Sequence, residues 1–219
     1  KHSILNTHKN WILKLNKKIF KIYVYYIGNK KDKNTNKIEQ YADSFFNHTD
    51  AESLINQLSA DGLDIIVYID VGMSPKSQIL GSLRLAAIQC SAVGHPVTSG
   101  LKNIDYALSG ELMEPHNGRA HYSEKLINLP NNGQCYEAPK IKLDGGSRSL
   151  NKSDKVVYFN LQKLFKLLPQ DDHIYLDIIK ENPNSCFWFM QGKNDLVTDI
   201  FKNRILRLSQ NSDLRFEKC

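Results

Sequence analysis

The chain has 219 residues, of which 41% are hydrophobic, and it carries a formal net charge of +6. Its length allows one large domain or two small ones, and its hydrophobic content excludes a disordered tail. No apolar run approaches the roughly 20 residues that a membrane span needs, and we expect no signal peptide. The lysines are scattered, so the charge is better explained by a solvated surface than by a nucleic-acid interface.

The four cysteines are widely spaced and show no Cys/His ligand pattern. We therefore expect neither a disulfide framework nor a zinc site, and a cytoplasmic location fits best. The chain starts at Lys1 without a methionine and stops at Cys219, so we expect it to be a piece of a longer protein.

Helix-like and strand-like segments alternate along the first part of the chain. A helix is predicted at residues 11–18, and the aromatic run "FKIYVYYIG" after it predicts a strand. Asp50 caps a helix that ends at Gly62, and Pro75 suits the first turn of another. Three further strands are predicted in "LDIIVYID", "AAIQCSAVG" and "IDYALSG".

Prolines, paired glycines and polar residues gather between residues 131 and 155, as in a connection between domains. A β-α-β-α order follows: "KVVYFN", "QDDHIYLDIIKENPN", "SCFWFM" and "NDLVTDIFKNRI". This order predicts a parallel sheet wrapped by helices. We expect one α/β lobe at residues 1–134, a linker at 135–154 and the beginning of a second lobe at 155–219, which is too short for a complete domain.

Two α/β lobes predict a ligand cleft at the carboxyl ends of their strands. The stretch "GHPVTSG" follows one such strand: Gly94 allows close backbone approach or a positive φ, while Thr98 and its neighbours offer hydroxyls and free amides to a sugar or phosphate. His95 is suited to donate to a phosphate. The alternative is that its side chain only hydrogen-bonds its own turn.

Two other strand ends are candidates. Gly72 and Ser74 lie in "DVGMSP", which has neither the GxGxxG nor the P-loop pattern and so identifies no nucleotide. In "FNLQKLFK", residues 162–166 form the expected entrance to a helix, where backbone amides attract anions. Lys166, one turn in, would neutralise a leaving phosphate. A solvated lysine on an amphipathic helix is the alternative.

The chain resembles the catalytic region of O-GlcNAc transferases, specifically the bacterial SPINDLY-like branch. The resemblance is carried by "DIIVYIDVGMSP", "LRLAAIQCSAVGHPVTSGLKNIDYALSGELMEP" and "HYSEKLINLPN", and it resumes at "VVYFNLQKLFKLLPQDD" and "NPNSCFWFM". Bacterial cytoplasmic N-glycosyltransferases also carry a GHP motif followed by IDY. The resemblance implies a GT-B-like α/β fold with two Rossmann-like lobes, of which the second is incomplete here.

The implied reaction is metal-independent, inverting transfer of a sugar from a nucleotide donor, UDP-GlcNAc, to Ser or Thr of a protein acceptor, with no other cofactor. Lys166 matches the lysine that neutralises the diphosphate, and Gln162 resembles a glutamine of the bacterial branch. Gly94 and His95 match positions close to the transferred sugar, and residues 72–74 match the turn on the acceptor side. His2 matches an amino-terminal histidine proposed as a base.

The chain departs from the family pattern at several points. Animal members have a tyrosine where His95 stands, so donor contact is a better expectation for His95 than a catalytic duty. The N-glycosylating relatives have a histidine at the position of Gly100, which disfavours asparagine as acceptor. The family's later nucleotide-binding segment and the preceding tetratricopeptide repeats are absent from this sequence. Two alternatives therefore stay open: GDP-fucose-dependent O-fucosylation, and an inactive binding module.

Overall fold

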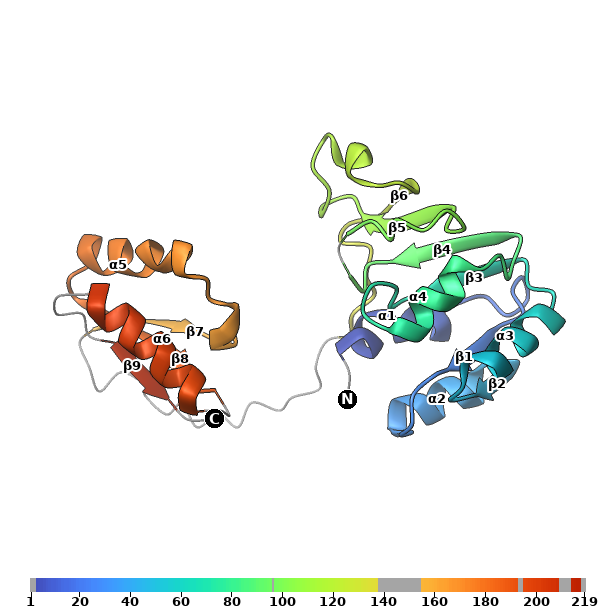
Figure 1. The fold of residues 1–219 in the computed structure, drawn as a ribbon, viewed down its shortest axis with the longest axis horizontal. Coiled ribbons are helices and arrows are strands. Elements are labelled where there is room, and N and C mark those ends of the chain that lie inside the picture. Colours follow the sequence, from blue (N-terminus) through green and yellow to red (C-terminus); the bar gives the residue numbers. More distant parts are fainter. Residues whose placement is uncertain (1–2, 96, 138–154, 193–194, 209–213, 218–219) are drawn as a thin grey trace. The chain divides into compact units, whose positions relative to one another are not determined.

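The computed structural model describes residues 3–95, 97–137, 155–192, 195–208 and 214–217 (Figure 1). The chain divides into two compact units, Lys1–Lys140 and Ile141–Cys219, which we call unit 1 and unit 2. Each unit is described by itself. Residues 138–154, which make up most of the expected linker, lie outside the described residues. His2, the proposed base, also lies outside them.

Unit 1 is an α/β structure with parallel strands (Figure 1). Strands β3 to β6 form a four-stranded sheet in the order β3-β4-β5-β6, and β1 and β2 form a separate parallel pair. The elements are α1 (Ser3–Leu13), β1 (Tyr23–Tyr26), α2 (Lys33–Tyr41), β2 (Ser44–Asn47), α3 (Ala51–Ala60), β3 (Ile65–Tyr68), α4 (Pro75–Ser82), β4 (Ile88–Ala92), β5 (Tyr106–Gly110), the 3₁₀ turn η1 (Gly118–His121) and β6 (Lys125–Leu129).

The helix starts of unit 1 follow from local hydrogen bonding. The Asp50 carboxylate accepts the Ser53 amide at 2.7 Å, and Gly62 follows the helix end with a φ of 57°. Pro75 occupies the first turn of α4, so both predicted helices are confirmed. The helix predicted at residues 11–18 is wrong in its bounds, because α1 ends at Leu13 and the Asn16 side chain instead accepts the Lys18 amide in a turn.

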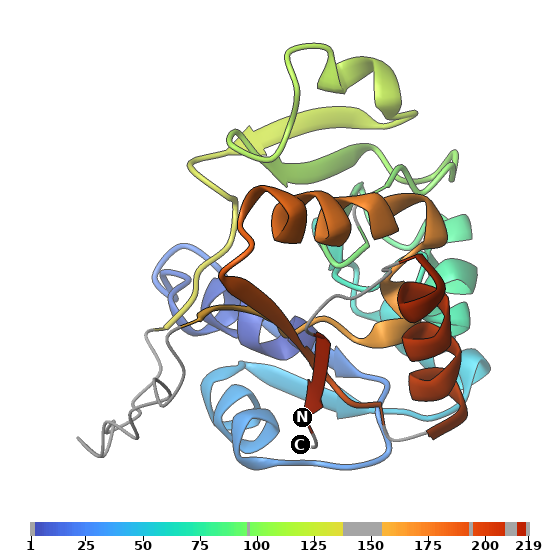
Figure 2. The same cartoon turned by 90° about the vertical axis from the view of Figure 1, so that its left-hand side faces the viewer.

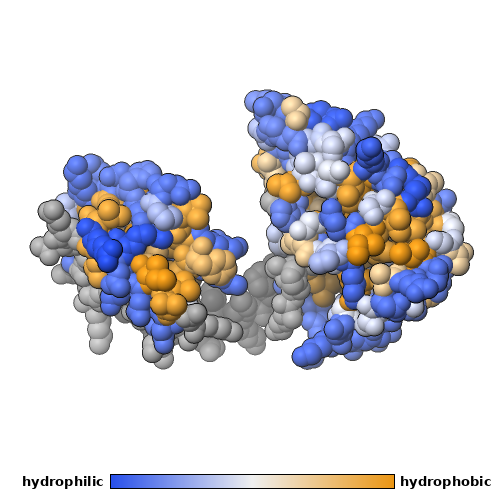
Figure 3. Space-filling view, in the orientation of Figure 1, coloured by the Kyte–Doolittle hydropathy of each residue, from blue (hydrophilic) through white to orange (hydrophobic). Residues whose placement is uncertain are grey.

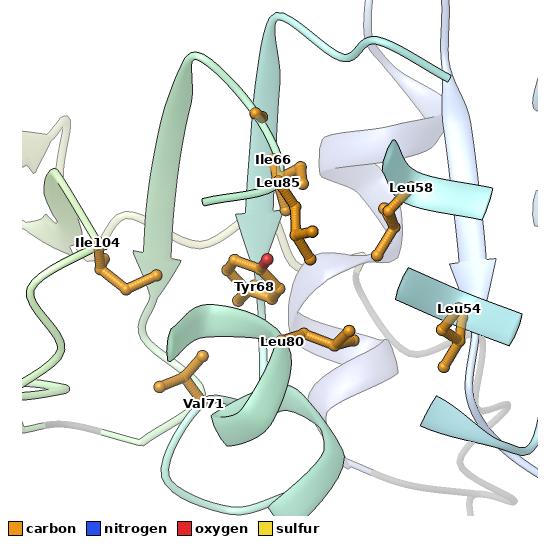
Figure 4. Close-up of a cluster of buried hydrophobic side chains, with 9 residues drawn as sticks. Leu54, Leu58, Ile66, Tyr68, Val71, Leu80, Leu85 and Ile104 are labelled. Atoms are coloured by element: carbon orange, nitrogen blue, oxygen red, sulfur yellow. The ribbon is translucent and has the colours of Figure 1, made fainter. Parts of the chain in front are cut away.

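The hydrophobic core of unit 1 lies between one face of the four-stranded sheet and the helices α3 and α4 (Figure 4). Leu54 and Leu58 of α3 and Leu80 of α4 pack with Ile66 and Tyr68, which alternate along β3 with exposed residues. Burying each such leucine contributes roughly 1.5–3 kcal/mol. This packing fixes β3, whose carboxyl end leads to the predicted site residues Gly72 and Ser74.

Unit 2 is a smaller α/β structure with the parallel strand order β7-β8-β9. Its elements are β7 (Val156–Asn160), the 3₁₀ turns η2 (Leu164–Lys166) and η3 (Pro169–Asp171), α5 (Asp172–Glu181), β8 (Ser185–Met190), α6 (Asp195–Leu208) and β9 (Leu214–Glu217). Helices α5 and α6 both cover the sheet face that carries Phe187 and Phe189 (Figure 2). The strands predicted in "KVVYFN" and "SCFWFM" and the helices predicted in "QDDHIYLDIIKENPN" and "NDLVTDIFKNRI" are confirmed.

The described surface of both units mixes polar and hydrophobic residues (Figure 3). On α6, Leu196 and Ile200 are exposed, as is Ile79 on α4. No helix within the described part of the chain combines the length and apolar character needed to cross a membrane. Cys90, Cys135 and Cys186 are free thiols.

Candidate functional site

Two loops at the carboxyl ends of β3 and β4 meet through Gly72 and His95. Gly72 has a φ of +87°, a backbone conformation that favours glycine. A Cβ atom on Gly72 would lie only 3.3 Å from Cγ of His95, so the imidazole packs directly on this glycine. The structure therefore brings together two of the predicted site residues, although they are separated by a strand and a helix in the sequence.

The His95 ring leaves one nitrogen available. The turn itself is closed by main-chain bonds, from the Gly94 amide to the Ala92 carbonyl at 2.7 Å and from the Val97 amide to the His95 carbonyl at 2.9 Å. Nδ1 of His95 is buried and has no hydrogen-bond partner among the described residues. A buried polar atom without a partner is uncommon in proteins and suggests that a group from outside the described residues completes it. The left-handed backbone conformation of this stretch falls at Gly100, with a φ of 67°.

The β3 loop is held rigid by its own side chains. Ser74 is the N-cap of α4 and accepts the Ser77 amide at 3.4 Å. The Ser77 hydroxyl donates to Asp70 at 2.6 Å, and the Gly72 amide donates to the Gln78 side chain at 3.2 Å. The loop thus presents Gly72 in a fixed position, while the Ser74 hydroxyl is engaged in capping.

The hydroxyls of "VTSG" point to a carboxylate inside unit 1, which corrects the expectation that they are free for a ligand. Thr98 Oγ1 donates to Glu124 Oε2 at 2.7 Å, and the Ser99 amide donates to Glu124 Oε1 at 2.7 Å. The Ser99 hydroxyl donates to the same carboxylate, and the Gly100 amide donates to Thr98 Oγ1 at 3.3 Å. A contact of Thr98 with a substrate stays a prediction.

Glu124 organises this loop. Its side chain is only 3% exposed, and it accepts three bonds from Thr98 and Ser99. Burial acts to raise the pKa of Glu124, but the hydrogen bonds from Ser99 and Thr98 together hold that pKa below its ordinary value. Glu124 is therefore an ionised anchor. This role of Glu124 was not predicted from the sequence, since its donors lie about 25 residues away along the chain.

The aspartate of the IDY motif is likewise structural. Arg84 binds Asp105 through both terminal nitrogens, at 2.6 and 3.0 Å, and the Gln89 amide donates to the same carboxylate at 2.8 Å. The Arg84 side chain holds the pKa of Asp105 below its ordinary value. The motif joins the start of β4 to the start of β5, at the opposite end of the strands from His95.

A cavity of about 450 Å³ opens beside the β4 loop within unit 1. Its apolar wall is formed by Val93, Val97, Met113 and Pro115. Its polar groups, besides Thr98, come from the end of β5 and from the segment after it, and they include the carboxylate of Glu114. The volume is in the range of small-ligand sites.

In unit 2, Lys166 lies on a short 3₁₀ turn and not one turn inside a helix, which corrects the prediction. The turn η2 ends at Lys166, and the α-helix begins only at Asp172. Pro169 supports this break, because it cannot donate to a continuous helical ladder. Lys166 is exposed, and no residue that the structure describes forms an ion pair with its ammonium group. Gln162 is also exposed and accepts the Lys163 amide at 3.0 Å.

The Lys166 loop is nevertheless anchored on both sides. Leu164 is 3% exposed and packs into the core of unit 2. Arg204 on α6 donates to the Leu167 carbonyl at 2.8 Å and pairs with Asp172, with Nε 2.7 Å from Oδ2. The loop is therefore held at its two ends, with Lys166 between them facing solvent. Neither anchor was expected from the sequence.

The described residues contain no group of three His, Cys, Asp or Glu side chains placed to hold a metal ion. The expectations for Lys166, Gln162, Gly94, His95 and Ser74 as substrate-binding or catalytic residues remain predictions.

Comparison with known proteins identifies relatives of the chain. Residues 11–135 match the model of glycosyl transferase family 41. Two curated relatives are named as probable UDP-N-acetylglucosamine–peptide N-acetylglucosaminyltransferases. SEC from Arabidopsis thaliana is 26% identical over 152 residues, 64% of this chain and 15% of the relative. SPINDLY from Solanum lycopersicum is 27% identical over 139 residues, 62% of this chain and 15% of the relative.

The fold has a counterpart of known structure. A mutant O-GlcNAc transferase from Thermobaculum terrenum matches 99% of this chain and 42% of its own, with a TM-score of 0.84 at 15% identity. This likeness confirms the predicted GT-B-like fold. The chain spans about 15% of the length of the curated relatives above. Because the family model covers more than half of its residues, the chain belongs to glycosyl transferase family 41.

Proposed function

We propose that the chain carries part of the catalytic region of a protein O-glycosyltransferase, which transfers GlcNAc from UDP-GlcNAc to Ser or Thr. The observation that carries the proposal is the contact between Gly72 and His95, with Nδ1 of His95 buried and unpartnered among the described residues. The names of the curated relatives support the donor and the peptide acceptor.

In the proposed reaction, an acceptor hydroxyl attacks the anomeric carbon of the sugar while the bond to the nucleotide diphosphate breaks. The anomeric configuration inverts because attack and departure occur on opposite faces. His95, whose ring packs on Gly72, contacts the donor sugar. Lys166, exposed on its anchored turn, supplies the positive charge that the leaving diphosphate requires, so no metal ion is needed. His2 is the proposed base.

The proposal is tested by calorimetry and by a transfer assay on this chain and on a version extended by its flanking coding sequence. We expect the extended version to bind UDP-GlcNAc and to modify a Ser-containing peptide in the presence of EDTA. GDP-fucose is titrated in parallel, since fucosyl transfer is the alternative reaction. Absence of heat with either donor would leave a non-enzymatic binding module as the remaining function.

Lys166→Ala in the extended version should lower turnover by about a hundredfold, as expected for the loss of one charge contact to a transition state. Lys163→Ala is the matched control, because Lys163 is an exposed lysine of the same loop. A loss within about threefold for Lys166→Ala, or an equal loss in both variants, would remove Lys166 from the mechanism.

A further inference from the structure

The cavity beside the β4 loop contains a carboxylate whose oxygens have unequal surroundings. Oε1 of Glu114 accepts from the Ser109 hydroxyl at 2.5 Å and from the Tyr122 hydroxyl at 2.7 Å. Oε2 accepts from no residue that the structure describes, and no described Lys or Arg pairs with Glu114. Gly118 stands beside Oε2, and a Cβ atom there would lie 2.8 Å from it. Glu114 lines the cavity, and Oε2 is its oxygen without a partner among the described residues.

Both hydroxyl donors engage the same oxygen of the Glu114 carboxylate, Oε1. Burial, together with the hydrogen bond to Glu114, raises the pKa of Tyr122 to about 12, so its phenol remains a donor at neutral pH. Oε1 therefore already accepts from two hydroxyl donors, and Oε2 is the oxygen left for a ligand. A half-buried carboxylate is costly without a partner cation. The nearby Arg119 does not supply one, because its guanidinium donates to the carbonyls of Tyr122 and Glu124.

The apolar wall defines the rest of the ligand. Val93, Val97, Met113 and Pro115 suit a methylene stem, and an anion is disfavoured by Glu114. A stem that ends in a cation is the chemistry of arginine and lysine. We propose that this cavity binds a basic side chain of a polypeptide, in which case the transferase would prefer acceptors with Arg or Lys near the modified residue. That the polypeptide is an acceptor rests on the proposed function.

The test uses the 219-residue chain without a donor and two fluorescein-labelled heptapeptides of Gly, Ala and Ser. One peptide carries a central arginine and the other carries citrulline, which has a similar shape but no charge. By fluorescence anisotropy, the arginine peptide should bind about tenfold tighter, as expected for a charge-assisted hydrogen bond. Equal affinity of the two peptides would overturn the proposal.

Three variants locate the site. Glu114→Gln retains an acceptor for Ser109 and Tyr122, and it should bring the two peptides to within about twofold of each other. Glu111→Gln, an exposed carboxylate of the same loop outside the cavity lining, should keep the tenfold preference. His121→Ala removes the imidazole of the cavity and should also keep it. If His121→Ala lost the tenfold preference for the arginine peptide while Glu114→Gln kept it, the assignment of Glu114 as the binding group would be contradicted.

These readouts separate the cavity from the reaction. Arginine preference without any sugar transfer by the extended version would support the binding of a basic side chain in the cavity and contradict the proposed function. Equal transfer to Ser beside arginine and to Ser beside citrulline would support the proposed function and overturn the proposal that the cavity binds a basic side chain. Binding of free GlcNAc that is lost in Glu114→Gln, with no arginine preference, would assign Oε2 to a sugar hydroxyl and also overturn it.

Discussion

The two units fix their predicted site loops in different ways, although each uses one buried carboxylate. In unit 1, Glu124 is 3% exposed and holds residues 98 and 99 through neutral hydroxyl and amide donors. In unit 2, Asp172 is 1% exposed and pairs with the guanidinium of Arg204, which also holds the Leu167 carbonyl. The first arrangement spreads one charge over several weak donors, and the second depends on a single cation.

This difference predicts how each unit responds to the loss of a partner. Removal of one neutral donor leaves Glu124 with the others, whereas removal of Arg204 leaves a buried charge with no counterion. The chain has two tryptophans, Trp11 in unit 1 and Trp188 in unit 2. Replacement of either one by phenylalanine leaves a fluorescence probe specific to one unit, which is necessary because a two-unit chain need not unfold in one step.

The largest effect is expected from Arg204→Ala. It should lower the free energy of unfolding of unit 2 by about 3 kcal/mol, at the lower end for a broken buried pair because Arg204 itself is partly exposed. Urea unfolding followed by Trp188 fluorescence in a Trp11→Phe background measures it. Arg207→Ala, an exposed arginine of the same helix, is the control. If the two variants lose the same stability, the ion pair does not anchor the Lys166 loop.

Glu124→Ala should have the next largest effect, on unit 1. It leaves Thr98 and Ser99 without their acceptor inside the protein, at a cost of about 2 kcal/mol. The loss should appear in urea unfolding followed by Trp11 fluorescence in a Trp188→Phe background. Glu111→Ala serves as control, because Glu111 is exposed and accepts only the Asn131 amide among the described residues. A loss no greater than that of the control would show that the donors find water instead.

Local patterns in the sequence predicted most of the fold. Asp50 and Pro75 mark helix starts because capping and the fixed φ of proline act within one turn. Strands β1, β3, β4, β5, β7 and β8 were recognisable as short apolar runs. Helix α2 and strands β2, β6 and β9 were not predicted. The bounds of α1 were missed because the apolar spacing at residues 11–18 continues past the residue where the helix ends.

The candidate site was only partly predictable. The approach of His95 to Gly72 agrees with the rule that the carboxyl ends of parallel strands share one edge of a sheet. The bonds from Thr98 and Ser99 to Glu124, and from Arg204 to Asp172, link residues at least 25 positions apart, and no local pattern specifies such pairs. Lys166 was placed inside a helix because its apolar neighbours resemble a helical face, whereas the buried Leu164 belongs to a single 3₁₀ turn.

A smaller effect tests whether unit 1 depends on backbone rigidity as well as on Glu124. Gly72→Ala and Gly62→Ala both place a side chain at a positive φ, at about 1 kcal/mol each. Only Gly72→Ala adds a close contact, with His95, whereas a Cβ on Gly62 meets nothing within 4 Å. The stability difference between these variants therefore isolates that contact. The His95 ring signals in NMR spectra should shift in Gly72→Ala alone; identical spectra would mean that the ring does not pack on this glycine.

The smallest expected effect is the pH dependence of the Glu124 anchor. The hydrogen bonds of Ser99 and Thr98 hold the pKa of Glu124 below its ordinary value of about 4.3 despite its burial. The contribution of Glu124 to the free energy of unfolding is therefore fully present above that value and is lost as the pH falls through the lower pKa of the folded state. In the Trp188→Phe background, the stability followed by Trp11 fluorescence should thus decline, relative to the same protein carrying Glu124→Gln, between about pH 5 and 3.

The comparison with Glu124→Gln matters because other carboxylates of unit 1, among them Asp32, Asp43, Asp50 and Asp105, also have lowered pKa values. Their acid losses are common to both proteins and cancel in the difference. Curves that stay parallel throughout this range would mean that Glu124 does not hold its loop as an ionised acceptor. A buried carboxylate surrounded by neutral donors would then be no anchor at all, and unit 2, with its guanidinium, would be the only unit whose site loop is fixed by charge.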